Sequence, residues 1–248
     1  SLAGGLQFEE IFFNVDVAEK GAALIEVAIT PFSDEATAAN NRVERSVRVV
    51  NEKINVLCIE GSARWEFRYL RAMLKRDPRI NATFIATRAQ PELAQQSSEY
   101  IAEFPEDREE AFSYDLVILG DVNSSFFSVE AFQRLEELVK DRGGSLLMLC
   151  GSRFAPASYA GTPVERMLPV GFDPDAAWEE VEESVYPVLT PEGRSSLVMT
   201  LENDQEDNDL VWSRVAPLDR VPPLLAPRPG ATVLAELSDT QSRTDRYP

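Results

Sequence analysis

The stretch INVLCIEGSARWEFRYLRAMLKRDPRINATFIATR, residues 54–88, decides the fold class. It opens with a continuous apolar run ending at Gly61, which is typical of a parallel strand covered on both faces. Apolar residues then recur at helical spacing as far as Pro78, which predicts a helix, and a second strand-like run follows. The helix stripe that we expect in the core consists of Trp65, Tyr69, Ala72 and Met73. Phe67 is expected to point away from that core, toward the preceding segment.

The alternation of strand and helix continues along the chain. Apolar runs predict strands in residues 114–122 and 145–151, and helical patterns fall in residues 105–112 and 128–144. Ser128 stands at the N-cap position of the second of these helices. Because strands that alternate with helices require right-handed crossovers, we predict an α/β fold with a doubly wound, mostly parallel sheet.

The two ends of the chain follow different patterns. Strand-like runs between short polar segments predict β structure in residues 1–50, similar to the last strands of an immunoglobulin-like sandwich. We therefore expect a partial immunoglobulin-like segment in residues 1–50 and an α/β domain in residues 51–248. In the C-terminal part the pattern loosens, and strands are expected in residues 178–193 and 231–237. Trp212 is expected to be a packing anchor for these strands.

The charge of the chain limits its partners. It carries 24 basic and 42 acidic residues, a formal net charge of -18. Such a charge repels phosphate backbones and anionic lipid headgroups, which argues against nucleic acid and bare membrane as partners. No apolar run approaches the roughly 20 residues needed to span a bilayer, and the first residues lack the pattern of a signal peptide. Because both ends look like cuts, we expect an excised piece of a larger protein.

Histidine is absent from the sequence, and two cysteines, Cys58 and Cys150, are present. Histidine is the usual general base near neutral pH and the commonest metal ligand. Its absence excludes Ser-His-Asp and Cys-His triads and HExxH zinc sites. We predict no metal site and no cofactor. Two cysteines do not make a disulfide framework, so we expect both to be reduced.

The polar residues after the predicted strands form a candidate ligand crevice, because ligands of open α/β sheets bind beyond the carboxyl ends of the strands. Its residues are Glu60, Gly61, Ser62, Arg64, Asp121, Asn123, Ser124, Gly151, Ser152 and Arg153. Arginines beside free N–H groups suit a carboxylate or a phosphate. In a second interpretation, Glu60 and Asp121 pair with Arg64 and Arg153 in a closed internal network. In a third, the two carboxylates form an acid–base couple or hold a divalent cation.

Cys150 is the one candidate nucleophile. It follows the apolar run in residues 145–149, and nucleophiles of α/β enzymes often sit at such strand ends. A free thiol has a pKa of about 8.5. Arg153 is close enough in sequence to lower that pKa, but an arginine cannot accept the proton as a general base would. The alternative is that Cys150 is a small apolar packing residue.

Five segments carry a resemblance to a known family: residues 56–78, 104–122, 142–152, 159–170 and 189–193. Together, from about Glu52 to Leu237, the chain resembles the class I glutamine amidotransferase-like domains. It looks most like the divergent version found in large bacterial membrane-anchored proteins, where an immunoglobulin-like segment precedes the domain. The resemblance implies a flavodoxin-like fold and a parent protein anchored in the bacterial envelope. The sequence of this chain itself gives no location.

The resemblance does not carry the family's activity with it. Active members place the cysteine in a G-x-C-x-G context, with a histidine and an acidic residue downstream. In this chain Met148 and Leu149 precede Cys150 where the first glycine would help, and Ser152 follows in place of the second. No histidine is present to act as the base.

The sequence therefore favours a non-catalytic domain that serves as an interaction or ligand-sensing module of a larger protein. The expected partners are other domains of the parent chain, a protein, or a small-molecule ligand. A second hypothesis is an amidotransferase-like or hydrolase-like enzyme that uses Cys150, or Glu60 with Asp121, on an unidentified substrate. A third is a structural spacer domain.

Overall fold

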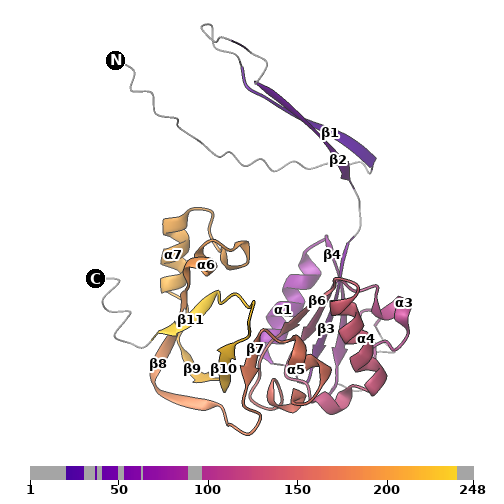
Figure 1. Cartoon of the computed structure of the whole chain (residues 1–248), viewed down its shortest axis with the longest axis vertical. Coiled ribbons are helices and arrows are strands. Elements are labelled where there is room, and N and C mark those ends of the chain that lie inside the picture. The colour runs from indigo at the N-terminus through magenta and orange to yellow at the C-terminus, as the bar shows by residue number, and fades with distance from the viewer. Residues whose placement is uncertain are drawn as a thin grey trace. The chain divides into compact units, whose positions relative to one another are not determined.

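The computed structural model describes residues 21–30, 37, 41–49, 53–62, 64–88 and 97–238. The chain divides into two compact units, Ser1–Lys53 and Ile54–Pro248, whose elements are labelled in Figure 1.

The described part of the first unit is a β-hairpin. Strands β1 (Gly21–Ala28) and β2 (Arg42–Val49) pair antiparallel, with Gly21 opposite Val49 and Ala28 opposite Arg42. Leu24, Val27 and Val43 are exposed on it. A two-stranded sheet is not a sandwich, so the immunoglobulin-like segment stays a prediction. Residues 1–20, which belong to the segment expected to form β structure, lie outside the described residues.

The second unit is built on a parallel sheet of four strands. These are β3 (Ile54–Glu60), β4 (Ile80–Ala86), β5 (Leu116–Leu119) and β6 (Ser145–Met148), in the spatial order β4-β3-β5-β6. All three pairings are parallel. The prediction of a mixed α/β fold with a parallel sheet is confirmed. This strand order is compatible with a flavodoxin-like core, and it reverses between β3 and β5.

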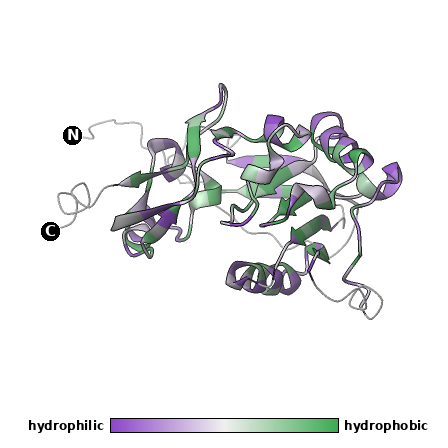
Figure 2. Ribbon diagram, turned by 90° about the horizontal axis from the view of Figure 1, so that it is seen from below, coloured by the Kyte–Doolittle hydropathy of each residue, from purple (hydrophilic) through white to green (hydrophobic). Residues whose placement is uncertain are grey.

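Short and long helices lie between these strands and directly after β6. They are α1 (Trp65–Arg76), α3 (Arg108–Ala111), η1 (Ser124–Phe126), α4 (Val129–Lys140), η2 (Ala157–Tyr159) and α5 (Pro163–Met167). As predicted, Ser128 caps α4, since its hydroxyl accepts a hydrogen bond from the Ala131 N–H at 3.0 Å. Figure 2 shows both hydrophobic and hydrophilic residues on the helices, as expected of helices that cover a sheet with one side and face solvent with the other.

The two faces of the sheet are covered by different helices, because side chains along a strand alternate between faces. On one face, Leu57, Val117 and their neighbours pack against Leu135 and Leu138 of α4. On the other face, residues of α1 complete a second core. That core consists of Val56, Cys58, Phe67, Leu74, Phe84 and Ile118.

The predicted orientation of α1 is wrong. Trp65 and Tyr69, expected in the core, are 66% and 70% exposed, whereas Phe67 is buried and packs its ring against Phe84. The buried face contains an arginine: the guanidinium of Arg71 lies 5.6 Å from the Phe84 ring centre. This polar residue interrupts the true apolar stripe in the sequence, so the opposite face, with its tryptophan and tyrosine, looked more hydrophobic.

The C-terminal part adds smaller sheets and helices. Strand β7 (Val170–Phe172) pairs with β10 (Leu224–Pro227), and β8 (Glu179–Leu189) lies between β9 (Leu218–Val221) and β11 (Ala235–Ser238). The helices here are α6 (Pro191–Arg194), η3 (Leu197–Met199) and α7 (Gln205–Ser213). All of these pairings are antiparallel, which explains why the βα rhythm of the sequence fades after β6.

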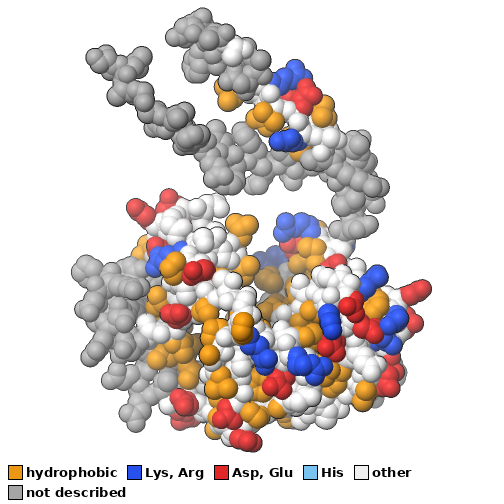
Figure 3. Space-filling model, in the orientation of Figure 1, with side chains coloured by type: hydrophobic (Ala, Val, Ile, Leu, Met, Phe, Trp, Pro, Cys, Tyr) orange, Lys and Arg blue, Asp and Glu red, His pale blue; other side chains and the backbone are white. Residues whose placement is uncertain are grey.

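The surface of the described part carries mixed charges. Figure 3 shows acidic and basic side chains lying next to one another over α3 and α4, where Glu137 pairs with both Arg108 and Arg134. Among the described helices, none is long and apolar enough to cross a membrane.

Candidate functional site

The structure brings the residues of the predicted crevice together at the carboxyl ends of the parallel strands. Glu60 is the last residue of β3, Asp121 lies two residues after β5, and Cys150 lies two residues after β6. Arg64 connects the first and last of these strand ends. Its guanidinium donates to the Glu60 carboxylate and also to the Cys150 carbonyl oxygen at 3.2 Å.

Glu60 is a buried carboxylate whose oxygens are already used by protein donors. It is 2% exposed. It accepts hydrogen bonds from the backbone N–H groups of Gly61 at 2.8 Å, Ser62 at 3.3 Å and Asp121 at 3.2 Å. It also forms an ion pair with Arg64, whose Nη2 lies 2.9 Å from Oε2. Burial opposes the charge on Arg64, but the hydrogen bond and charge of Glu60 outweigh that effect and raise the pKa of the guanidinium.

Asp121 is held in a similar way. It is 3% exposed, and its carboxylate accepts from three consecutive backbone N–H groups. These belong to Arg153 at 3.1 Å, Phe154 at 2.7 Å and Ala155 at 3.0 Å. The predicted ion pair of Glu60 with Arg64 is therefore confirmed, whereas Asp121 binds the backbone of Arg153 and its neighbours. The guanidinium of Arg153 takes no part in this network, and the residue is exposed.

Three glycines let the loops close over the two carboxylates. A side chain added at Gly120 would place its Cβ 2.2 Å from a Glu60 carboxylate oxygen, and one at Gly151 would meet the Asp121 carboxylate at 2.3 Å. At Gly61 an added Cβ would lie 2.1 Å from the Asp121 carbonyl oxygen. These contacts mean that the space between the strand ends is filled by the chain's own groups.

The remaining predicted residues have local roles or none that the structure defines. The Asn123 side chain accepts from the Ser125 N–H at 2.9 Å and caps η1. The Ser124 hydroxyl donates to the Ser158 carbonyl oxygen, and its N–H donates back to the Ser158 hydroxyl at 3.2 Å. Ser152 is exposed. These contacts fix the loop after β5 against the segment that contains η2.

The surroundings of Cys150 work against a nucleophile. Burial raises the pKa of the Cys150 thiol, and the negative charge of Asp121 adds to the effect, while a backbone hydrogen bond and Arg64 oppose it only in part. A reactive cysteine needs a lowered pKa. Within the described residues no residue other than glycine has a positive φ. Cys150 therefore lacks the strained turn on which nucleophile elbows present their side chain.

Tyr159 is a buried polar group beside this network. Its side chain is fully buried, and its hydroxyl has no hydrogen-bond partner among the described residues. Burial raises the pKa of the phenol, and the negative charges of Asp121 and Glu60 raise it further. The ring packs against Phe127 and Phe132, so the residue serves as a core aromatic with an unused hydroxyl.

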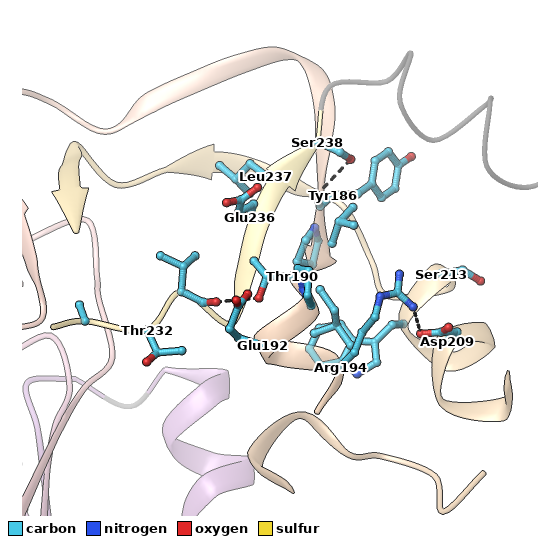
Figure 4. Close-up of a pocket in the computed structure, with 17 residues that line it drawn as sticks. Tyr186, Thr190, Glu192, Arg194, Asp209, Ser213, Thr232, Glu236, Leu237 and Ser238 are labelled. Atoms are coloured by element: carbon cyan, nitrogen blue, oxygen red, sulfur yellow. Dashed lines mark hydrogen bonds and ion pairs between the residues drawn. The ribbon is translucent and has the colours of Figure 1, made fainter. Parts of the chain in front are cut away.

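A cavity of about 760 Å³ lies elsewhere, and its wall comes from β8, α6, α7, β11 and the segment before β11. This volume falls within the range of roughly 300–1,000 Å³ that is usual for small-molecule sites. Its apolar wall consists of Pro187, Val188, Leu189, Pro191, Trp212, Ala231, Val233 and Leu237. Figure 4 shows the polar side chains that stand around the same space.

Hydrogen bonds hold the wall of this cavity in place. The Thr190 hydroxyl donates to the Val233 carbonyl oxygen at 2.6 Å and accepts from the Gly193 N–H at 2.9 Å, which ties α6 to the segment before β11. The Trp212 indole N–H donates to the Met199 carbonyl oxygen at 2.8 Å, which fixes the indole ring. The cavity wall is therefore built from restrained side chains, as a preformed site requires.

The charges at the cavity are unevenly paired. Arg194 forms an ion pair with Asp209, and the two side chains meet across the space between α6 and α7 (Figure 4). Glu192 and Glu236 also line the cavity, and neither forms an ion pair with another described residue. The cavity thus combines an apolar wall with a few polar groups that could orient a ligand.

Sequence reasoning missed this cavity. Its wall comes from four elements and one connecting segment that lie far apart in the sequence, and no periodic pattern links them. Trp212, interpreted as a packing anchor for the strands, lines the cavity and hydrogen-bonds to Met199. The one usable signal was Thr190-Pro191, a cap followed by proline that predicts a helix start directly after a strand.

Neither a metal-binding cluster of the described residues nor a similar known protein identifies the function of this site. No group of three or more cysteine or acidic side chains within the described ranges is arranged to hold a metal ion. Comparisons with protein-family models, with curated proteins and with solved structures find no match to this chain.

Proposed function

We propose that this chain is a non-catalytic binding module with a class I glutamine amidotransferase-like domain, part of a larger protein of the bacterial envelope. The observation that carries the proposal is the closed network around Glu60 and Asp121. An acid–base pair or an anion site needs polar groups that are free to hydrogen-bond with a substrate. Here both buried carboxylates already accept hydrogen bonds from groups of the protein.

The enzyme hypothesis loses support for the same reason. Cys150 lies beside this network with a raised pKa, and no histidine exists to take its proton. A thiol of this kind is mostly protonated near neutral pH and is a poor nucleophile.

The cavity lined by β8, α6, α7 and β11 is the proposed place of binding. It has the volume and the mixed apolar and polar wall of a small-molecule site. A structural spacer would need no such cavity, so ligand binding there separates the module from the spacer hypothesis.

A thermal-shift screen with amino acids, dipeptides, nucleosides and monosaccharides tests the proposal. A ligand present at 100 times its Kd stabilises the folded chain by about 2.7 kcal/mol, which is roughly 5–10 °C in Tm for a domain of this size. We expect at least one compound to raise the Tm of the wild type and of an Ala216→Trp control, which alters an exposed residue outside the cavity wall.

The same compound should not raise the Tm of Ala231→Trp, because that substitution places an indole in the cavity wall. If no compound acts, or if the shift survives in Ala231→Trp, the cavity is not the binding site and the spacer hypothesis gains.

A further inference from the structure

The outer face of α1 is an exposed surface of unusual composition. Helical spacing places six residues on this face, and all six are exposed: Trp65, Arg68, Tyr69, Ala72, Met73 and Arg76. Met73 is 55% exposed, beside the still more exposed rings of Trp65 and Tyr69. An outer helix face of a globular protein is normally lined with charged and polar residues. Here two large aromatic rings and a methionine face solvent instead.

The charge on the α1 outer face is opposite in sign to that of the chain. The chain has 42 acidic and 24 basic residues, yet this face carries two arginines, and the single carboxylate of α1, Glu66, lies at its edge beside Met73. Neither Arg68 nor Arg76 forms an ion pair with another described residue. The other two cations of α1 that lie beside this face, Arg71 and Lys75, are paired. Both form ion pairs with Glu99, at N···O distances of 3.2 Å and 2.6 Å.

The side chains of the α1 outer face are already arranged against one another. The rings of Trp65 and Tyr69 stack with their centres 6.3 Å apart, and the Arg68 guanidinium lies 5.3 Å from the centre of the Trp65 ring. These contacts restrict the rotamers of the Trp65, Tyr69 and Arg68 side chains in the unbound protein. Less conformational entropy is then lost on binding.

We infer that the α1 outer face docks a short acidic segment of a protein partner, one that carries Asp or Glu beside aliphatic or aromatic side chains. Tryptophan, tyrosine, methionine and arginine are enriched at protein interfaces, and the first two with arginine dominate binding hot spots. Unpaired arginines complement carboxylates. A helix of 12 residues is about 18 Å long, which suits one helix or extended strand of a partner.

An anionic membrane fits the α1 outer face less well. A bilayer is a plane, so it would also approach the rest of a chain whose net charge is -18. A short segment can contact α1 alone. This inference is independent of the cavity and of any ligand bound there.

Selection of random 12-residue peptides by display against the full chain tests the inference. We expect the enriched peptides to have an excess of Asp and Glu together with Leu, Ile or aromatic residues. Synthetic peptides from that pool should bind at least tenfold more weakly to Trp65→Ser with Tyr69→Ser, and to Arg68→Glu with Arg76→Glu.

The matched control removes one exposed apolar residue and one exposed cation from a different helix, with Val129→Ser and Lys140→Glu on α4. It should bind the peptides like the wild type. Because all substituted residues are exposed, each variant should stay folded. The Arg76→Glu and Lys140→Glu variants should lower the urea midpoint slightly and alike, since each places an acid in the last turn of its helix.

Three results would overturn the inference. One is that no peptide is enriched over a selection against the arginine variant. Another is that vesicles of phosphatidylserine and phosphatidylcholine bind the chain through Trp65 and Tyr69. A third is that the chain dimerises and the α1 variants stay monomeric, which would make a second copy the partner.

Discussion

Replacing Glu60 by glutamine tests whether the crevice is a structural network. The substitution keeps the shape of the side chain but removes its negative charge. That charge compensates the guanidinium of Arg64, and the carboxylate that carries it accepts hydrogen bonds from three backbone N–H groups. Removing one partner of a buried ion pair typically costs about 3–5 kcal/mol. The Arg64 side chain is 20% exposed, so water relieves part of this cost and we expect about 3 kcal/mol, the lower end.

Urea denaturation followed by circular dichroism measures the effect. With an m-value of about 3 kcal/mol/M, a loss of 3 kcal/mol lowers the midpoint by roughly 1 M. The control is Glu103→Gln at an exposed position, which should change the free energy of unfolding by less than about 0.5 kcal/mol. A Glu60→Gln variant as stable as the wild type, or more stable, would refute the structural interpretation, because functional carboxylates are commonly held at a cost in stability.

Three further outcomes follow from individual buried groups. Tyr159→Phe should leave the free energy of unfolding unchanged or slightly higher, because the lost hydroxyl has no partner among the described residues. Tyr114→Phe should instead lower the free energy of unfolding by about 1 kcal/mol, because it removes a hydrogen bond to Thr83. Urea unfolding of both variants checks the contrast, and a clear loss of stability in Tyr159→Phe would reveal a hidden partner. Burial, with a contribution from Glu60, raises the pKa of the Cys58 thiol to about 12, so the unfolded chain loses this proton first and stability falls as the pH rises from about 9 toward 12. Unfolding measured across that pH range should show the stability advantage of the wild type over Cys58→Ala shrinking, and a constant difference would contradict the shift. Asp121→Asn should destabilise the chain in urea by about 2 kcal/mol, since a charged acceptor of three N–H groups becomes neutral, and an unchanged midpoint would mean that the loop of Arg153 is held by other contacts.

The parallel sheet was predictable because its signal is local. Each strand is a short apolar run, the helix α4 shows a regular apolar stripe, and the Ser128 cap marks its start. The meeting of Glu60, Asp121 and Cys150 also followed from the sequence, since the carboxyl ends of parallel strands lie at one edge of the sheet.

Other features were out of reach because they depend on tertiary contacts. No local pattern indicates that Arg71 packs against the rings of Phe84 and Tyr100. The sequence pattern therefore predicts the wrong buried face for α1. The partners of Asp121 are backbone N–H groups, which leave no mark on the identity of the residues that supply them. The cavity depends on antiparallel pairing of β8 with β11, which lie more than forty residues apart.

The rate of alkylation of Cys150 by iodoacetamide as a function of pH tests the non-catalytic assignment most directly. The measurement uses a Cys58→Ala background, so that only one thiol reports. Because burial raises the pKa of Cys150, we predict slow alkylation whose rate rises only above the free-thiol pKa of about 8.5. Fast alkylation with a midpoint well below that value would mean a thiolate held ready for chemistry, and it would contradict the assignment.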